Sequence, residues 1–341
     1  MKQAVYHGIE DVRITEVDIP TPGPGEVVVQ NKVTLTCGTD VKMFMRGYRY
    51  DPPHLIGHEA AGIVHAVGEG VTRFSVGDRV VAHNTAPCHQ CYYCKKGNHS
   101  MCVDLPSNLG AYAEYQLIPA NIVRETMFQL PDDMPYEQAA LTEPLACAVY
   151  GTAMVPIELG DTVVVNGCGP IGLMFVRLAH LRGARALATD VNEKRLQPAT
   201  QLGAQHVVAI TEDIDQVAAV RAFTEDERGV DIAIEAAGLP QVWELAFDMV
   251  CPGGTVLFFG GTKKDTSVTL DCTRFHYDQI TAKGVFHTTP IHVRAAFELL
   301  SMGAIRHEDF VQNSYELDDL ESALREHARG DVIKNVIRYD S

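Results

Sequence analysis

The sequence lacks a hydrophobic leader and is poor in basic residues. No run of roughly 15 or more apolar residues follows a basic start, so neither a signal peptide nor a membrane span is predicted. Lysine and arginine total 28 against 44 aspartate and glutamate residues, a net charge of −16. This excess of acid argues against binding to nucleic acid or to an anionic membrane. No internal repeat or low-complexity segment is present, which excludes a repeat architecture.

Nine cysteines occur in this chain without a secretion signal. They are therefore expected to be reduced thiols, metal ligands or small buried side chains rather than a disulfide framework, and the expected location is the cytoplasm. A length of 341 residues predicts two domains, at roughly 150 residues each.

The first half, residues 1 to 148, is predicted to be mostly β. Short β-branched runs alternate with Pro and Gly clusters, a spacing typical of a small barrel or sandwich. The expected strands are residues 2–6, 12–17, 26–33, 62–68, 78–82 and 111–118.

The second half begins with a dinucleotide-binding pattern. A buried-type strand, 161–166, leads into Gly167-Cys-Gly-Pro-Ile-Gly172, an amphipathic helix to about residue 182, and a strand ending in Asp190. The glycines allow a tight turn and close backbone approach to a pyrophosphate, and the helix N-terminus favours the anion. The acid favours NAD over NADP, whereas Arg195 leaves NADP open. The candidate cofactor residues are Gly167, Gly169, Pro170, Ile171, Gly172, Asp190 and Arg195.

The alternation of strands and helices then continues, which predicts a doubly wound parallel sheet and an α/β fold. Further strands are expected at 206–210, 230–235, 255–259 and 280–286. A helix expected over 193–202 contains Pro198, which the pattern leaves unexplained. The tail, with helices at 293–302 and 317–329 and a strand at 335–338, is expected to return to the first domain.

Four cysteines form the strongest local metal motif. Cys88, Cys91, Cys94 and Cys102 have the spacing C-x2-C-x2-C-x7-C within the segment 88–102. Four thiolates fill a tetrahedral Zn²⁺ site and leave no open position, which makes the site structural. An iron–sulfur cluster and a redox thiol pair are the alternatives.

A second, weaker candidate centres on Gly57-His58-Glu59. Apolar residues flank this pair, and burying ionisable groups there requires compensation, for which a metal is common. Cys37 and Glu143 would add a thiolate and a carboxylate to one Zn²⁺. The alternative is a hydrogen-bonded core histidine beside a surface glutamate.

Five motifs occur along the chain in this order: Cys37-Gly-Thr-Asp40, Gly57-His-Glu-Ala-Ala-Gly62, the four-cysteine segment, Glu143-Pro-Leu145 and Gly167-x-Gly-x-x-Gly172. Together they resemble the zinc-dependent medium-chain alcohol dehydrogenases. The Glu-Pro-Leu version is similar to the sorbitol and threonine dehydrogenase branch. The resemblance covers essentially the whole chain. It implies a GroES-like catalytic domain (1–148 and 290–341) and a Rossmann domain (149–289), with two zinc ions per chain, one catalytic and one structural.

The resemblance also implies residue roles. Cys37 and His58 would bind the catalytic zinc directly, while Glu59 and Glu143 would each be a ligand or support one. Thr39 would hydrogen-bond the substrate oxygen and begin a proton relay. A homotetramer or homodimer is the expected assembly.

Two departures concern the substrate. Lys42 stands where many relatives carry a relay histidine, and His287-Thr288 replaces the Arg-Tyr pair of sorbitol dehydrogenases. The expected reaction is hydride transfer between NAD and a secondary alcohol, or the matching ketone, of a polyol, sugar or cyclitol. A phosphorylated substrate would suit the cations Lys42, Arg46 and Arg49, which are otherwise solvated. The alternatives are a threonine-like amino alcohol and a catalytically silent nucleotide-binding member.

Overall fold

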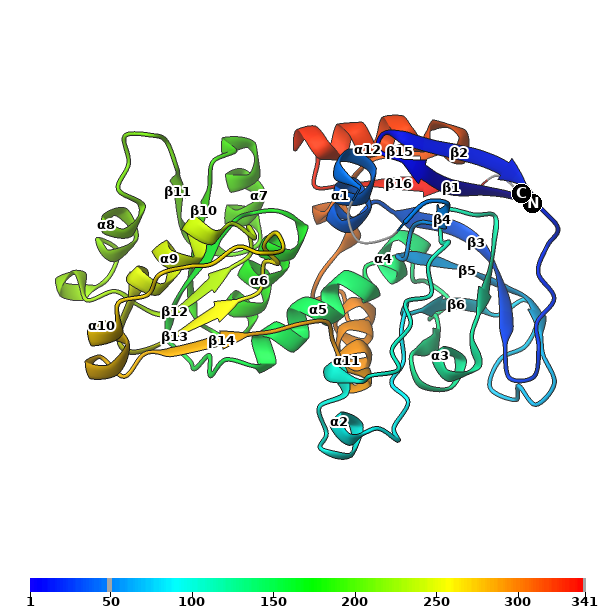
Figure 1. Cartoon of the computed structure of the whole chain (residues 1–341), viewed down its shortest axis with the longest axis horizontal. Coiled ribbons are helices and arrows are strands. Elements are labelled where there is room, and N and C mark those ends of the chain that lie inside the picture. The colour runs from blue at the N-terminus through cyan, green and yellow to red at the C-terminus, as the bar shows by residue number, and fades with distance from the viewer. Residues whose placement is uncertain (48–50, 340–341) are drawn as a thin grey trace. The chain divides into compact units, whose positions relative to one another are not determined.

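The computed structural model describes residues 1–47 and 51–339 and comprises two compact units (Figure 1). Unit 1 contains Met1–Ala146 and Thr288–Ser341, and unit 2 contains Cys147–His287. The boundaries expected from the sequence lie two residues further along the chain at each junction. Arg49, one of the three clustered cations, lies outside the described residues.

Unit 1 is built on two sheets. The larger sheet has the strand order β15-β16-β3-β5-β6-β8, with β7 also paired to β3, and the smaller has the order β2-β1-β4. The strands are β1 (Lys2–Gly8), β2 (Asp11–Glu16), β3 (Val27–Leu35), β4 (His54–Leu55), β5 (Ala60–Val67), β6 (Arg79–Ala82), β7 (Tyr115–Ile118), β8 (Met127–Gln129), β15 (Val311–Glu316) and β16 (Lys334–Arg338). The last of them, β16, pairs antiparallel with β3, so the tail returns to this unit.

The strand predicted over 111–118 is only half formed, because β7 begins at Tyr115. The Ala111 carbonyl instead accepts hydrogen bonds from the hydroxyls of Thr34 (2.7 Å) and Tyr339 (2.9 Å). Since side chains satisfy this carbonyl, the ladder does not extend to it.

Several short helices complete unit 1. They are α1 (Gly38–Arg46), α2 (Tyr92–Lys95), α3 (Ala120–Glu125), α4 (Tyr136–Ala140), α11 (Pro290–Ser301) and α12 (Leu320–Arg329), with 3₁₀ turns η1 (His99–Met101), η4 (His307–Asp309) and η5 (Leu317–Asp319). α5 (Thr142–Ala153) begins in unit 1. Helix α12 buries Leu320, Ala323, Leu324 and His327, the i, i+3, i+4, i+7 stripe of an amphipathic helix. It ends at Gly330 in a left-handed cap.

Unit 2 contains one parallel sheet of six strands in the order β11-β10-β9-β12-β13-β14. The strands are β9 (Thr162–Asn166), β10 (Arg185–Asp190), β11 (Ala204–Ala209), β12 (Val230–Glu235), β13 (Val250–Phe258) and β14 (Thr281–Gly284). Counted in chain order, this is the 3-2-1-4-5-6 arrangement of a Rossmann sheet. The doubly wound parallel sheet predicted from the sequence is confirmed, and its order reverses between β9 and β12.

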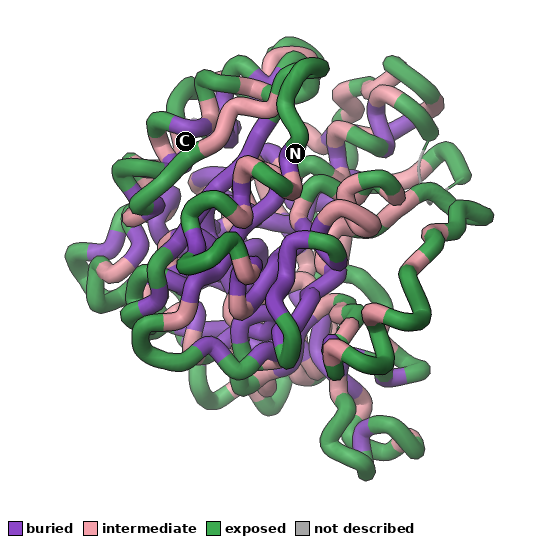
Figure 2. Tube along the Cα trace, turned by 90° about the vertical axis from the view of Figure 1, so that its left-hand side faces the viewer, coloured by how far each residue is buried: buried purple, intermediate pink, exposed green. Residues whose placement is uncertain are grey.

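Helices connect these parallel strands. They are α6 (Pro170–Leu181), α7 (Leu196–Gln201), α8 (Gln216–Arg221), α9 (Pro240–Met249) and α10 (Cys272–Tyr277), with 3₁₀ turns η2 (Glu193–Arg195) and η3 (Glu225–Glu227). Every residue of β9 is buried, as a strand covered on both faces requires, and buried segments occupy the interior in Figure 2. Across the described residues, none of the helices has the length and hydropathy needed to cross a membrane.

Pro198 marks a break in the helix predicted over 193–202. The segment divides into the 3₁₀ turn η2 and the helix α7, and Pro198 is the third residue of α7. The first N–H groups of an α-helix have no intrahelical acceptor, so a proline there removes no hydrogen bond of the helix.

We expect Pro198→Ala to lower the free energy of unfolding by less than about 1 kcal/mol, because proline is tolerated at this position and only restricts the unfolded chain. Removing a proline from a helix interior would instead raise that energy by about 3 kcal/mol. Urea unfolding followed by circular dichroism distinguishes the two, and clear stabilisation would contradict the assignment.

Candidate functional site

Cys37 lies at the N-terminus of α1, where a reciprocal cap holds it. Its Sγ accepts a hydrogen bond from the Thr39 backbone N–H (3.5 Å), and the Asp40 carboxylate accepts from the Cys37 backbone N–H (3.3 Å). This arrangement resembles a capping box with sulfur in place of the usual hydroxyl. Thr39 is half-buried at the second position of the helix, so the Cys37 thiol and the Thr39 hydroxyl both belong to the first turn of α1.

His58 is oriented by the loop before β5. Gly57 has φ = +87°, and a Cβ atom there would lie 2.7 Å from the backbone nitrogen of Tyr112, so only glycine fits. The His58 Nδ1 atom lies 3.3 Å from Asp40 Oδ1, and the Tyr112 hydroxyl donates to Asp40 Oδ2 at 2.9 Å. Asp40 therefore connects the imidazole of His58 to the cap that holds Cys37.

The charges around His58 are strongly coupled. Burial alone would lower the pKa of His58, but Asp40 and Cys37 reverse this effect and raise the pKa well above its usual value. Burial alone would raise the pKa of Asp40, whereas His58 and the Tyr112 hydroxyl lower it below the usual range. Nδ1 of His58 faces the acid, which leaves the other ring nitrogen as the candidate metal donor.

Glu59 is fully buried and pairs with a buried lysine. The Lys334 Nζ atom lies 2.8 Å and 2.6 Å from the two carboxylate oxygens of Glu59 and donates a third hydrogen bond to the Thr36 carbonyl at 2.9 Å. Glu59 and Lys334 are 0% and 1% exposed. The alternative of a surface glutamate beside a core histidine is therefore wrong.

Glu143, the second residue of α5, is also buried. Its Oε1 atom lies 3.9 Å from His83 Nε2. Burial raises the pKa of Glu143 to about 7, and the negative charges of Glu59 and Asp40 add to the effect. Acidic groups thus crowd this part of unit 1 without a matching number of cations.

This cluster fits a divalent metal. The candidate ligand atoms of Cys37, His58 and Glu59 lie within 4.8 Å of one another, while Glu143 lies outside that group, beside His83. Sulfur, nitrogen and carboxylate donors suit Zn²⁺. A dication would also offset the negative charges of Glu59 and Asp40, which add to the effect of burial on the pKa of Glu143.

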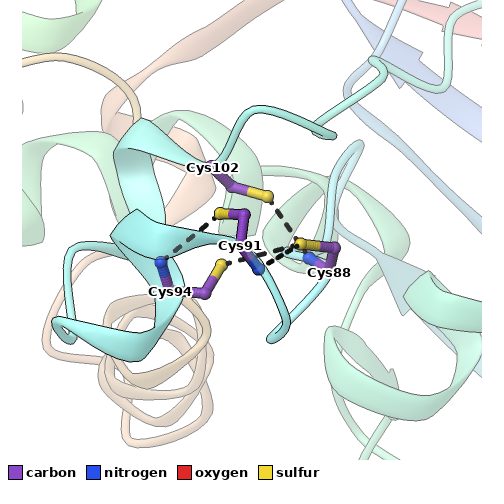
Figure 3. A group of neighbouring side chains, drawn as sticks. All are labelled: Cys88, Cys91, Cys94 and Cys102. Atoms are coloured by element: carbon purple, nitrogen blue, oxygen red, sulfur yellow. Dashed lines mark hydrogen bonds between the residues drawn. The ribbon is translucent and has the colours of Figure 1, made fainter.

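The four cysteines of the second metal motif converge as the spacing predicts (Figure 3). Their sulfur atoms lie within 4.8 Å of one another, and none is in a disulfide. Cys91 caps α2 and accepts from the Cys94 backbone N–H (3.5 Å), and two backbone N–H groups donate to Cys88 Sγ (3.4 Å each). The N–H groups of Cys94 and Val103 lower the pKa of Cys91 to about 6. Backbone donors that favour a thiolate fit a closed Zn²⁺ site.

The glycine turn of unit 2 has the tight packing that a dinucleotide site requires. A Cβ atom on Gly172 would lie 1.7 Å from the Gly167 carbonyl oxygen, so the turn and α6 touch only because residue 172 is glycine. Gly169 precedes α6, and Pro170 and Ile171 open that helix. An added Cβ on Gly169 meets no atom within 4 Å, which leaves that edge of the turn open to a ligand.

Asp190 ends β10 beside this turn. Its two carboxylate oxygens accept hydrogen bonds from the backbone N–H groups of Cys168 and Asn192, each at 2.7 Å. Each oxygen keeps acceptor capacity for a ribose hydroxyl. The buried Arg195 Nε atom has no hydrogen-bond partner among the described residues.

The sequence analysis missed Lys334 and the roles of Asp40 and Tyr112. A lysine between the apolar pairs Val332-Ile333 and Val336-Ile337 was a visible signal, because a buried ammonium needs a counter-charge. Its partner was not visible, since Glu59 lies 275 residues away.

Two family models match the chain. Residues 23–132 match the alcohol dehydrogenase GroES-like domain, and residues 170–302 match the zinc-binding dehydrogenase model. The fold class predicted for both units is thereby confirmed.

Individual proteins are similar over most of the chain. Sorbitol dehydrogenase of Bacillus subtilis is 30% identical over 95% of this chain and 92% of that enzyme. L-threonine 3-dehydrogenase of Pyrococcus furiosus is 35% identical over 76% of this chain and 74% of that enzyme. Among solved structures, a putative zinc-binding dehydrogenase from Sinorhizobium meliloti bound to NADP has a TM-score of 0.92 at 27% identity, covering 99% of both chains.

The two metal motifs should respond differently to mutation. We expect Cys37→Ala to abolish turnover with the fold intact and zinc content reduced from two ions to one, whereas Cys91→Ala should lower the melting temperature by roughly 5 °C or more, because structural zinc contributes folding energy. Elemental analysis, thermal unfolding and activity assays measure these effects. Loss of stability in Cys37→Ala together with loss of turnover alone in Cys91→Ala would overturn the assignment of the two motifs.

Lys334→Met should leave the Glu59 carboxylate buried without a counter-charge. We expect the free energy of unfolding to fall by about 3–5 kcal/mol, and by less in the double variant Lys334→Met/Glu59→Gln. Lys2→Met is the matched control, since the side chains of its ion pair with Asp318 are 42% and 56% exposed and solvent screens such a pair, so that its loss should leave the free energy of unfolding almost unchanged. Equal effects of the two lysine substitutions in urea unfolding would contradict this account.

Proposed function

Because the chain belongs to the family of zinc-binding alcohol dehydrogenases, we propose that it transfers hydride between NAD and a secondary alcohol of a polyol, sugar or cyclitol. The observation that carries the proposal is the donor set of Cys37, His58 and Glu59, whose ligand atoms lie within 4.8 Å of one another. Four thiolates fill a zinc site completely, whereas a site with mixed donors can keep one position open for a substrate.

The residues around this cluster have distinct proposed tasks. Zn²⁺, when bound, would act as a Lewis acid that lowers the pKa of an alcohol. Cys37 and His58 would hold it, with Asp40 orienting the imidazole. Lys334 engages both oxygens of Glu59, so Glu59 would serve the metal site while held in that ion pair, and Glu143 is the second candidate carboxylate. The Thr39 hydroxyl would accept a hydrogen bond from the substrate alcohol and, on taking its proton, would release its own hydroxyl proton toward solvent.

NAD is the proposed cofactor rather than NADP. Asp190 presents a carboxylate where the 2′-hydroxyl of the adenosine ribose is bound in Rossmann folds, and that charge repels a 2′-phosphate. Arg195, with its unpartnered Nε atom, and the NADP bound to the Sinorhizobium meliloti structure favour the opposite choice. Both cofactors therefore belong in the assay.

The sorbitol dehydrogenase of Bacillus subtilis, matched over nearly the whole chain, supports a polyol substrate. The threonine dehydrogenase of Pyrococcus furiosus, matched over a smaller share of the chain, supports an amino-alcohol substrate. Lys42 and Arg46 are exposed on α1 and would suit a phosphorylated polyol. The presence of the donor set and Thr39 argues against a catalytically silent protein.

The decisive test is the reduction of NAD and of NADP with polyols, sugars, polyol phosphates, cyclitols and L-threonine, with and without a chelator. We expect an uncharged polyol to be oxidised with NAD and the chelator to abolish turnover. Turnover of L-threonine alone would replace the polyol proposal with the amino-alcohol one. Turnover that survives complete zinc removal would overturn the proposed function.

Two further features belong to the proposal. All nine cysteines are free thiols, which supports a reducing compartment such as the cytoplasm. A homodimer or homotetramer is proposed from the family, and light scattering on the purified protein measures the assembly.

A further inference from the structure

Glu235 is a buried acid for which the proposed chemistry has no use. It is the last residue of β12 and is 0% exposed. Its Oε1 atom accepts hydrogen bonds from the backbone N–H groups of Ala237 (2.8 Å) and Gly238 (2.7 Å). Its Oε2 atom has no hydrogen-bond partner in the described part of the chain. A carboxyl group buried in this way stabilises a particular loop conformation at a cost in desolvation.

The same residue also holds the loop after β13. The Glu235 backbone carbonyl accepts from the N–H groups of Phe259 (3.0 Å) and Gly260 (2.9 Å). A Cβ atom on Gly260 would lie 2.7 Å from Glu235 Oε2 and 2.3 Å from the Gly238 nitrogen. The loop 236–239 and the loop 259–261 therefore pack directly on each other and on the Glu235 carboxyl group.

The loop after β12 reaches the glycine turn as well. A Cβ atom on Gly167 would lie 3.1 Å from the Ala237 nitrogen, and the Ala236 N–H donates to the Asn166 carbonyl at 2.9 Å. β9 and β12 are the neighbouring strands at which the sheet order reverses, and in such sheets the dinucleotide lies across that crevice. Asp190, at the end of β10, belongs to the adenosine half. The loops of β12 and β13 belong to the other mononucleotide half.

We propose that Glu235 is a positioning residue for the nicotinamide half of the dinucleotide: its buried carboxyl group holds the loops after β12 and β13 in one conformation beside the glycine turn. This inference rests on the dinucleotide binding contained in the proposed function. It does not depend on the metal cluster or on the identity of the alcohol.

The protonation of Glu235 agrees with this role. Burial raises the pKa of Glu235, and the backbone N–H groups of Gly238 and Ala237 offset part of that rise. The geometry asks only for an acceptor oxygen at Oε1, which a neutral carboxyl or an amide also supplies. A glutamine should therefore serve in place of the acid.

Trp243 is an intrinsic fluorescence probe of these loops. It is the one tryptophan of the chain, and its indole Nε1 donates to the Gly260 carbonyl at 3.1 Å. Its ring stacks on Phe258, with centroids 4.2 Å apart and an interplanar angle of 7°. Its emission in the cofactor-free protein therefore reports the surroundings formed by the loop after β13 and by the adjacent Glu235 carboxyl group, and quenching by added NADH reports binding.

The test compares Glu235→Ala and Glu235→Gln in the full-length, zinc-loaded protein. We expect Glu235→Ala to weaken NADH binding by about tenfold or more, because two buried backbone N–H groups lose their acceptor, and to shift the emission of Trp243 before any cofactor is added. Glu235→Gln should stay within about threefold of wild type, because its amide oxygen still accepts from both N–H groups. In turnover, KM for NAD should rise more than KM for the alcohol.

Asp231→Asn is the matched control. Asp231 lies at the other end of β12, where it accepts from the Thr162 N–H and pairs with Arg228. Its loss should lower the unfolding midpoint without changing NADH affinity. If Glu235→Ala does not fold, Glu235→Asp replaces it, since the shorter side chain withdraws the acceptor while keeping the charge; it too should bind NADH more weakly.

Wild-type NADH affinity and wild-type Trp243 emission in the folded Ala or Asp variant would overturn the role of Glu235 while leaving the proposed function intact. A loss of binding in Glu235→Gln as large as in the alanine variant would also overturn it. The proposed function fails separately, if the unsubstituted protein binds neither NADH nor NADPH.

Discussion

The buried ion pair between Lys334 and Glu59 is the interaction on which the catalytic half of the molecule depends. Moving both charges out of water is costly, and the cost is offset only when geometry and hydrogen bonds are good. Here the ammonium meets both carboxylate oxygens and the Thr36 carbonyl. Thr36 precedes Cys37 and Glu59 follows His58. Lys334, on the last strand β16, therefore connects that strand to the two segments that carry the candidate metal donors.

The two units assemble their sites in opposite ways. In unit 2, the turn after β9, Asp190 and the Glu235 loops follow successive strands of one parallel sheet, so the sheet order itself brings them to one edge. In unit 1, the pairing of β16 and β5 with β3 brings segments that are far apart in the chain to one end of an antiparallel sheet. The site also needs the cap of α1 and the turn at Gly57, and side chains such as Lys334 connect these segments across the ladder.

This difference explains how much the sequence could predict. The four-cysteine segment and the glycine turn are short motifs whose residues lie close together in the chain, so their spacing alone predicted the geometry. The mixed donor set was only a weak candidate from the residues alone, and the family resemblance supplied the expected role of each residue. Lys334 was missed because a buried charge is interpretable only with its partner. Pro198 was noticed but left unexplained, because the sequence does not show where a 3₁₀ turn gives way to an α-helix.

The charge balance of the mixed-donor cluster separates its two glutamates. Glu59 already has a permanent counter-ion in Lys334, so its negative charge is held in place whether or not a metal is bound. Glu143 lies 3.9 Å from His83 but contacts no lysine or arginine among the described residues, and burial with nearby acids raises its pKa to about 7. Its carboxylate is therefore the one whose charge is stabilised most by an incoming dication. A cluster with one carboxylate held by a lysine and one that responds to added charge can keep its architecture whether or not a metal is bound.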